Sequence, residues 1–177
     1  MIQAPIAANQ RSALPLAGCL ILALSGFTAR ADDPCAAFTW DVVHERAIFA
    51  TQPLALVAAT DAKTAPIFEI DRAYRISLDA QTTIQFASPL GNAGAPEGAF
   101  AGLVRISAAN ARRYRVALDR GFWLDVVEDG NALRSIDYQG GAGCDALHKI
   151  VEFALPAGKS LLLRFSGSAA PAVTVTR

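Results

Sequence analysis

The chain has 177 residues, of which 53% are hydrophobic and 18% charged, with 16 basic side chains against 16 acidic ones. This composition is that of one globular domain with a sizeable apolar core, and no low-complexity linker divides it. The charge balance argues against nucleic acid or an anionic membrane as a partner, because both require a clustered basic face.

The first 31 residues have the pattern of a cleavable signal peptide. Arg11 supplies a positive charge, residues 13–27 an apolar run, and Ala29-Arg30-Ala31 a small-x-small cleavage site. The run is shorter than the roughly 20 residues of a membrane-spanning helix. We therefore expect a single mature domain, residues 32–177, that is periplasmic or secreted and has no membrane span.

Leu16-Ala17-Gly18-Cys19 offers an alternative, because it resembles the lipobox of bacterial lipoproteins, in which the cysteine is acylated. In that motif the cysteine follows the apolar run. Here the most apolar part, residues 20–24, comes after Cys19. Cleavage after Ala31 is the favoured interpretation, and lipidation of Cys19 stays open.

Removal of the signal leaves two cysteines, Cys35 and Cys144. An even number of cysteines in an exported chain predicts a disulfide bond, with two free thiols as the alternative. Such a bridge closes a long loop, for which the loop-entropy model gives about 4 to 5 kcal/mol.

Alternating apolar residues predict a fold made almost entirely of strands. A strand over residues 38–42 leads into a short helix over 44–49, and the apolar run 54–59 predicts a buried strand. Further strands are predicted at 67–70, 73–78, 82–87, 101–107, 113–118, 122–127, 133–137, 150–155, 160–166 and 172–176. This series favours an all-β, antiparallel two-layer β-sandwich that is jelly-roll-like, with at most one short helix.

Residues 112–127 predict a β-hairpin in which two alternating runs are separated by Asp119-Arg120-Gly121. The intervening positions, Arg115 among them, are expected to face solvent. Residues 74–79 repeat the pattern of residues 114–119, which suits two equivalent strands of a layered protein. A second tight hairpin is predicted at Asp129-Gly130.

Trp123 is the leading candidate for binding. Its neighbours Phe122 and Leu124 take the core-facing phase, so Trp123 is expected to point outward beside Asp125. A flat indole beside polar groups suits stacking on a sugar ring. We predict a glycan or an envelope protein as the partner of Trp123, Asp125 and Trp40, with no cofactor. The alternative is that Trp123 is core, packed under Trp40 or the short helix.

The long loop at residues 89–98 is rich in glycine and proline, and it is expected to form the rim of this site. Loops of that length without regular structure are often functional.

Catalytic patterns are sparse. His44, Glu45 and His148 would be the ligands of a two-histidine, one-carboxylate metal site, but no short histidine spacing supports it. The carboxylates of Asp119, Asp125, Glu128 and Asp129 would serve a glycosidase, and those of Asp125 and Asp129 a calcium site. Acidic residues at turns more often hydrate or cap the loop. A serine triad leaves no fixed spacing in a sequence.

Two resemblances follow from short motifs. Residues 114–118, 123–127, 161–167 and 173–175 resemble bacterial pre-peptidase C-terminal domains, small secreted β-sandwiches usually appended to exported hydrolases. This resemblance implies a β-sandwich with an accessory role.

The motif from Cys35 to Phe49 resembles a group of short exported bacterial proteins labelled homogentisate 1,2-dioxygenase. That label implies iron held by two histidines and a glutamate. Only His44, Glu45 and His148 are available for it here, and the ligand motif of the dioxygenase family is not recognisable in this chain.

The first testable prediction concerns processing. Protein exported from a bacterial host is expected to begin at Asp32 and to carry the Cys35–Cys144 bond, and its intact mass reports both. A lipid adduct on Cys19, or two thiols that alkylate without reductant, would contradict this prediction.

Overall fold

The computed structural model describes residues 33–86, 97–141, 143–144, 147–167 and 173–176. Contacts divide the chain into two compact units, Met1–Ala31 and Asp32–Arg177. The predicted signal peptide, Cys19 and residues 89–96 of the predicted rim lie outside the described residues. Cleavage before Asp32 therefore stays a prediction.

The described residues form one short α-helix, one 3₁₀ turn and a series of strands. In chain order these are α1 (Val43–Phe49), β1 (Leu54–Val57), β2 (Ile67–Phe68), β3 (Arg72–Ser77), β4 (Asp79–Ala80), η1 (Gln81–Thr83), β5 (Phe100–Ser107), β6 (Arg112–Leu118), β7 (Trp123–Glu128), β8 (Asn131–Leu133), β9 (Asp137–Gly140), β10 (Lys149–Leu155), β11 (Ser160–Gly167) and β12 (Val173–Thr176). Within this part of the chain, no helix is both long and apolar enough to cross a membrane.

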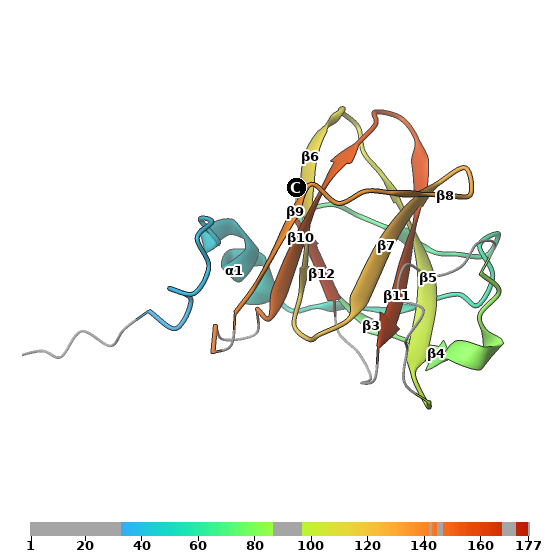
Figure 1. Ribbon diagram of the computed structural model, residues 1–177, viewed down its shortest axis with the longest axis horizontal. Coiled ribbons are helices and arrows are strands. Elements are labelled where there is room, and N and C mark those ends of the chain that lie inside the picture. Colours follow the sequence, from blue (N-terminus) through green and yellow to red (C-terminus); the bar gives the residue numbers. More distant parts are fainter. Residues whose placement is uncertain (1–32, 87–96, 142, 145–146, 168–172, 177) are drawn as a thin grey trace, which may run out of the picture. The chain divides into compact units, whose positions relative to one another are not determined.

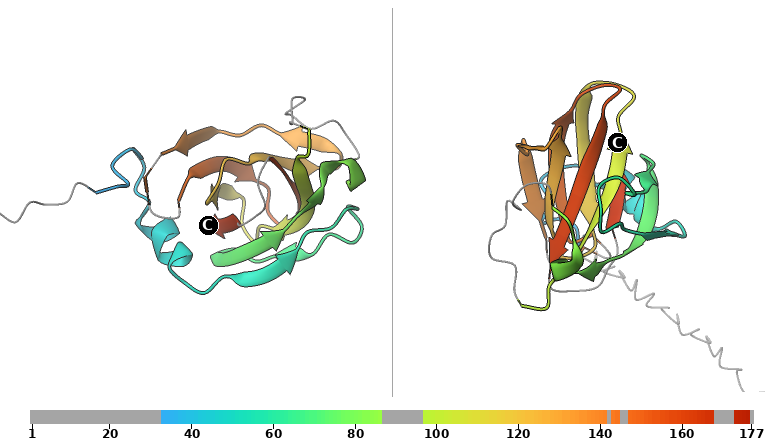
Figure 2. Two further views of the ribbon diagram at one scale, coloured as in Figure 1. Left: turned by 90° about the horizontal axis from the view of Figure 1, so that it is seen from below. Right: turned by 90° about the vertical axis from the view of Figure 1, so that its right-hand side faces the viewer.

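The strands form two sheets that face each other (Figures 1 and 2). Sheet A has the order β1-β3-β12-β6-β10-β9, and sheet B has the order β2-β5-β11-β7-β8, with β4 beside β5. The central orders β3-β12-β6-β10 and β5-β11-β7-β8 are those of a jelly roll. The predicted all-β sandwich is confirmed. Its pairing is mixed, because β1 runs parallel to β3 and β2 parallel to β5.

The core lies between the sheets and is filled by alternate residues of the central strands. Its largest apolar side chains include Tyr114, Phe122, Phe153 and Phe165, all buried. The predicted inward face of β10 and β11 is therefore confirmed. The tight turn at Asp129-Gly130 is also present, since β7 and β8 pair up to Glu128 and Asn131 and both turn residues have positive φ, 48° and 84°.

The predicted hairpin over residues 112–127 is wrong. β6 belongs to sheet A and pairs with β10 and β12, whereas β7 belongs to sheet B and pairs with β11 and β8. The turn between them crosses from one sheet to the other. Alternation reports which face of a strand is buried, and strands of opposite sheets bury their faces in the same core. The repeated pattern does mark two strands of one sheet, β3 and β6, on either side of β12.

Three other predicted strands need correction. Residues 54–59 form a shorter edge strand, β1, which is largely exposed rather than buried. In the range 82–87, the described residues hold the end of η1 and no strand. Residues 133–137 divide between β8 and β9, which belong to different sheets. In each case the apolar or alternating pattern predicted a strand, but packing against neighbouring elements determines whether a strand forms, how long it is and how much of it is exposed.

The predicted strand over residues 38–42 is also wrong, because this segment is irregular. Phe38 and Val42 pack with Cys35, Cys144 and Ile150 in a second, smaller apolar cluster. This cluster lies on the outer face of sheet A, where α1 also packs against β3 and β12. The segment is held by the predicted Cys35–Cys144 disulfide, which is present with an S–S distance of 2.07 Å.

A buried charge network joins α1 to the outer face of sheet A. Arg115 donates from Nη1 to Glu45 Oε1 at 3.3 Å, and its Nε lies 3.4 Å from Glu152 Oε2. The Glu45 side chain is 1% exposed and that of Arg115 is 21% exposed. The expectation that Arg115 faces open solvent is wrong, since the segment before β1 covers it.

The second testable prediction uses this network. Arg115→Ala removes the guanidinium that faces the buried Glu45 carboxylate, and we expect a loss of about 3–5 kcal/mol of unfolding free energy. Arg113 is the matched control, because it lies on the same strand face and contacts Glu152 but is 71% exposed. Arg113→Ala should cost about 0–1 kcal/mol. Urea unfolding measures both, and equal losses would contradict the burial of the Glu45 pair.

Candidate ligand-binding site

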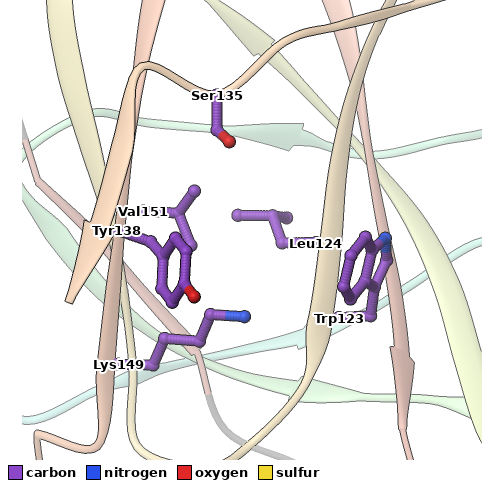
Figure 3. A pocket seen from close by; sticks show the side chains of 6 residues that line it. All are labelled: Trp123, Leu124, Ser135, Tyr138, Lys149 and Val151. Atoms are coloured by element: carbon purple, nitrogen blue, oxygen red, sulfur yellow. The ribbon is translucent and has the colours of Figure 1, made fainter. Parts of the chain in front are cut away.

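A cavity of about 290 Å³ opens at one edge of the sandwich, between β7 of sheet B and β9 and β10 of sheet A. Figure 3 shows its lining, in which Trp123 and Tyr138 stand on opposite sides. Among the described residues, its lining is Trp123, Leu124, Ser135, Tyr138, Lys149 and Val151. Its volume is just below the range of about 300–1,000 Å³ that is usual for ligand pockets.

Strand phase and register bring Lys149 and Tyr138 to this cavity. Lys149 is two residues before Val151, so it shares the inward face of β10. Tyr138 is paired with Val151 in the register of β9 and β10, which places it on that same face. Because β9 is the last strand of sheet A, little of sheet B lies above it, and Tyr138 is 67% exposed.

Trp123 begins β7 and takes the outward phase that was predicted for it. It is 40% exposed, while Leu124 beside it is buried. Its indole Nε1 donates to Asp125 Oδ1 at 3.0 Å. The other oxygen of Asp125 accepts from Arg164 Nη2 at 2.9 Å, and Arg164 is only 2% exposed. Asp125 is therefore a buried support that orients the indole.

Lys149 places a cation between the two aromatic rings. Its Nζ lies 5.7 Å from the centre of the Trp123 ring and 5.8 Å from that of Tyr138, within cation–π range. It also donates to the carbonyl of Phe122 at 3.4 Å. Burial lowers the pKa of Lys149. In the described part of the chain, no carboxylate lies within ion-pair distance of this amine.

Trp40, the third predicted binding residue, lies elsewhere. Its ring stacks on Arg115, 4.7 Å from the guanidinium carbon, on the outer face of sheet A. Trp123 lies at the edge of sheet B, so the structure does not bring the two tryptophans together. The alternative in which Trp123 packs as core under Trp40 is wrong.

The three residues of the alternative metal site are engaged separately. His44 Nε2 lies 2.9 Å from Asp71 Oδ1, Glu45 binds Arg115, and the backbone N–H of His148 donates to the carbonyl of Leu118. Among the described residues, no three His, Cys, Asp or Glu side chains converge as a metal site would require. The arrangement gives no support to a site on His44, Glu45 and His148.

The other acidic candidates are also held by cations or by burial. Glu128 and Asp129 lie 3.2 and 3.7 Å from Lys159 Nζ at the β7–β8 turn. Asp119 precedes β7, and burial raises its pKa while Arg120 and Arg75 lower it. The pairing of Glu128 and Asp129 with Lys159, and of Asp125 with Arg164, is that of structural carboxylates.

Sequence reasoning missed Lys149 and Tyr138. The sequence could have indicated Lys149, because it lies two residues before Val151 and so continues the alternating inward positions of β10. No sequence pattern indicated Tyr138, since its position depends on the pairing of β9 with β10. No family model, curated protein or solved structure matches this chain. The two resemblances described above therefore stay untested.

The third testable prediction concerns the support of Trp123. Asp125→Ala takes the carboxylate away from the buried guanidinium of Arg164, with an expected loss of about 3–5 kcal/mol. Glu128→Ala is the control, because it removes a carboxylate from the same strand whose partner, Lys159, is half-exposed, at a cost of about 0–1 kcal/mol. Denaturant unfolding compares the two. A small effect at Asp125 would contradict its role as a buried support.

Proposed function

We propose that this chain is an exported, non-catalytic binding module that holds a carbohydrate in the cavity between Trp123 and Tyr138. The observation that carries the proposal is the pair of exposed aromatic rings on opposite sides of one concave site. An exposed aromatic in a concave site is a common mark of recognition, whereas scattered exposed apolar residues are ordinary.

The lining suits a sugar ring in shape and chemistry. Trp123 and Tyr138 offer flat faces to the apolar face of a pyranose, and Leu124 and Val151 form the apolar floor. Polar groups are few, namely Ser135 and the Lys149 amine, which suits orientation by a small number of hydrogen bonds. The volume accommodates one ring of a longer chain, whose remainder would extend into solvent.

The cavity favours binding over catalysis because its described lining holds no carboxylate and no imidazole, the groups that most often act as general acid or base. The titratable side chains among the described lining residues are Lys149 and Tyr138. The compartment is proposed from the disulfide, which persists in oxidising surroundings such as the periplasm.

The fourth testable prediction separates binding from packing at Trp123. On a glycan array followed by titration with the best-bound sugar, Trp123→Ala should weaken binding about tenfold or more, because one stacked aromatic is lost. Thermal unfolding of the same variant should show a much smaller change than Phe153→Ala, whose side chain is fully buried.

Ile67→Ala is the matched control for a lost apolar surface. Ile67 is 72% exposed and does not line the cavity, so its replacement should leave sugar binding unchanged. Absence of any bound glycan, or a loss of stability at Trp123 as large as at Phe153, would overturn the proposal.

A further inference from the structure

We infer that the sugar bound in this cavity is an acidic one, whose carboxylate or sulfate group is held by the amine of Lys149. This inference rests on the proposed function and names its ligand class. It follows from the place of one cation, Lys149, among the described residues that line the cavity.

Lys149 breaks the pattern of its own strand. The inward positions of β10 that follow it are Val151, Phe153 and Leu155, all buried and apolar. A lysine in this phase brings its amine into the cavity, where Figure 3 shows it between Tyr138 and Trp123. A purely structural inward position would favour an apolar residue, because burying a charge costs free energy unless it is paired.

The charge of Lys149 is not balanced within the described part of the protein. Two carboxylates on the strands that flank the cavity are engaged with other groups: Asp125 holds Arg164 and Trp123, and Asp137 accepts from the backbone N–H of Tyr138. Burial lowers the pKa of Lys149, and no acidic group is among the causes that act on it. An anion from a ligand would supply the missing partner.

The same geometry argues against a cationic ligand. Two aromatic rings across a cavity would suit an alkylammonium group if the space between them were neutral. Here Lys149 already places a positive charge within 6 Å of both ring centres, so a second cation would be repelled. A sugar that carries an anion can stack on the rings and neutralise the amine at once.

The amine has hydrogen-bonding capacity for such a group. A lysine ammonium carries three N–H donors, and one of them is used by the carbonyl of Phe122 at 3.4 Å. In the described residues no other hydrogen bond from this amine is present. A carboxylate or sulfate oxygen would accept a charge-assisted bond, which is stronger than a bond between neutral groups.

The experiment compares each acid with its neutral form. Isothermal titration is run with oligosaccharides of galacturonate, glucuronate and mannuronate, and with their methyl esters, which keep the ring but lose the charge. A sulfated galactose oligosaccharide and its unsulfated parent separate sulfate from carboxylate as the anion. At least one acidic sugar should bind about tenfold or more tightly than its neutral counterpart, and salt should reduce that difference.

Variants of Lys149 then assign the charge. Lys149→Met keeps the length of the aliphatic chain and should abolish the preference for the acid, so that the acidic sugar and its neutral counterpart bind within about twofold of each other. Lys149→Arg keeps the charge and should retain the preference. Thermal midpoints of both variants confirm that they fold, and Trp123→Ala should weaken acid and neutral sugar alike.

The outcomes separate the two proposals. If neutral sugars bind as well as their acidic counterparts, or if Lys149→Met keeps the preference for the acid, the acidic ligand is overturned while the sugar-binding function stands. If neither the acids nor the neutral sugars of the panel and the array bind, both are overturned.

Discussion

The disulfide between Cys35 and Cys144 is the constraint on which the binding edge depends. It joins residues that are 109 positions apart, for which the loop-entropy model gives about 4–5 kcal/mol. It also fixes the segment before α1 against the connection between β9 and β10. From the same segment, the backbone N–H groups of Thr39 and Trp40 donate to Gln139 on β9. β9 has four residues and, among the described strands, pairs with β10 alone. The contacts of Gln139 with the segment before α1 therefore help to hold the strand that carries Tyr138.

Both sheets use buried charges on their outer faces, where a covering segment packs on polar strand positions. On sheet A, Arg115 lies under the segment before β1 and joins Glu45 to Glu152. On sheet B, Arg164 pairs with Asp125 and lies beside Phe86, whose ring centre is 5.9 Å from the guanidinium carbon. Buried ion pairs contribute little net stability compared with apolar residues, yet they are costly to break, so they specify one arrangement. On sheet B this specificity reaches the cavity directly, because Asp125 also accepts the indole N–H of Trp123.

Much of the fold was predictable because an alternating pattern reports burial. The faces of β10 and β11 and the exposure of Trp123 follow from it. The Asp129-Gly130 turn follows instead from residue types that accept positive φ. Pairing was not predictable in the same way. β6 and β7 bury their alternate residues in one core from opposite sheets, so a run of residues 112–127 looked like a hairpin. For this reason only part of the site was predictable. The exposure of Trp123 follows from alternation along its own strand, whereas the position of Tyr138 follows from the register of β9 against β10.

The position of the cavity follows from how the sandwich is filled. Its centre is packed with large apolar side chains, and protein interiors of this kind are close-packed. At the β9–β10 edge, Tyr138 and Lys149 keep the inward phase but are not fully covered by the opposite sheet, so they are available to a ligand, and Trp123 reaches the same cavity from the outward phase of β7. A residue in that position is freed from the requirement to be apolar. Lys149 occupies such a position and is only partly buried, whereas Val151, two residues further along the strand, is buried. Local departures from the packing rule of this kind are expected where a protein binds something, because stability alone would favour an apolar side chain there.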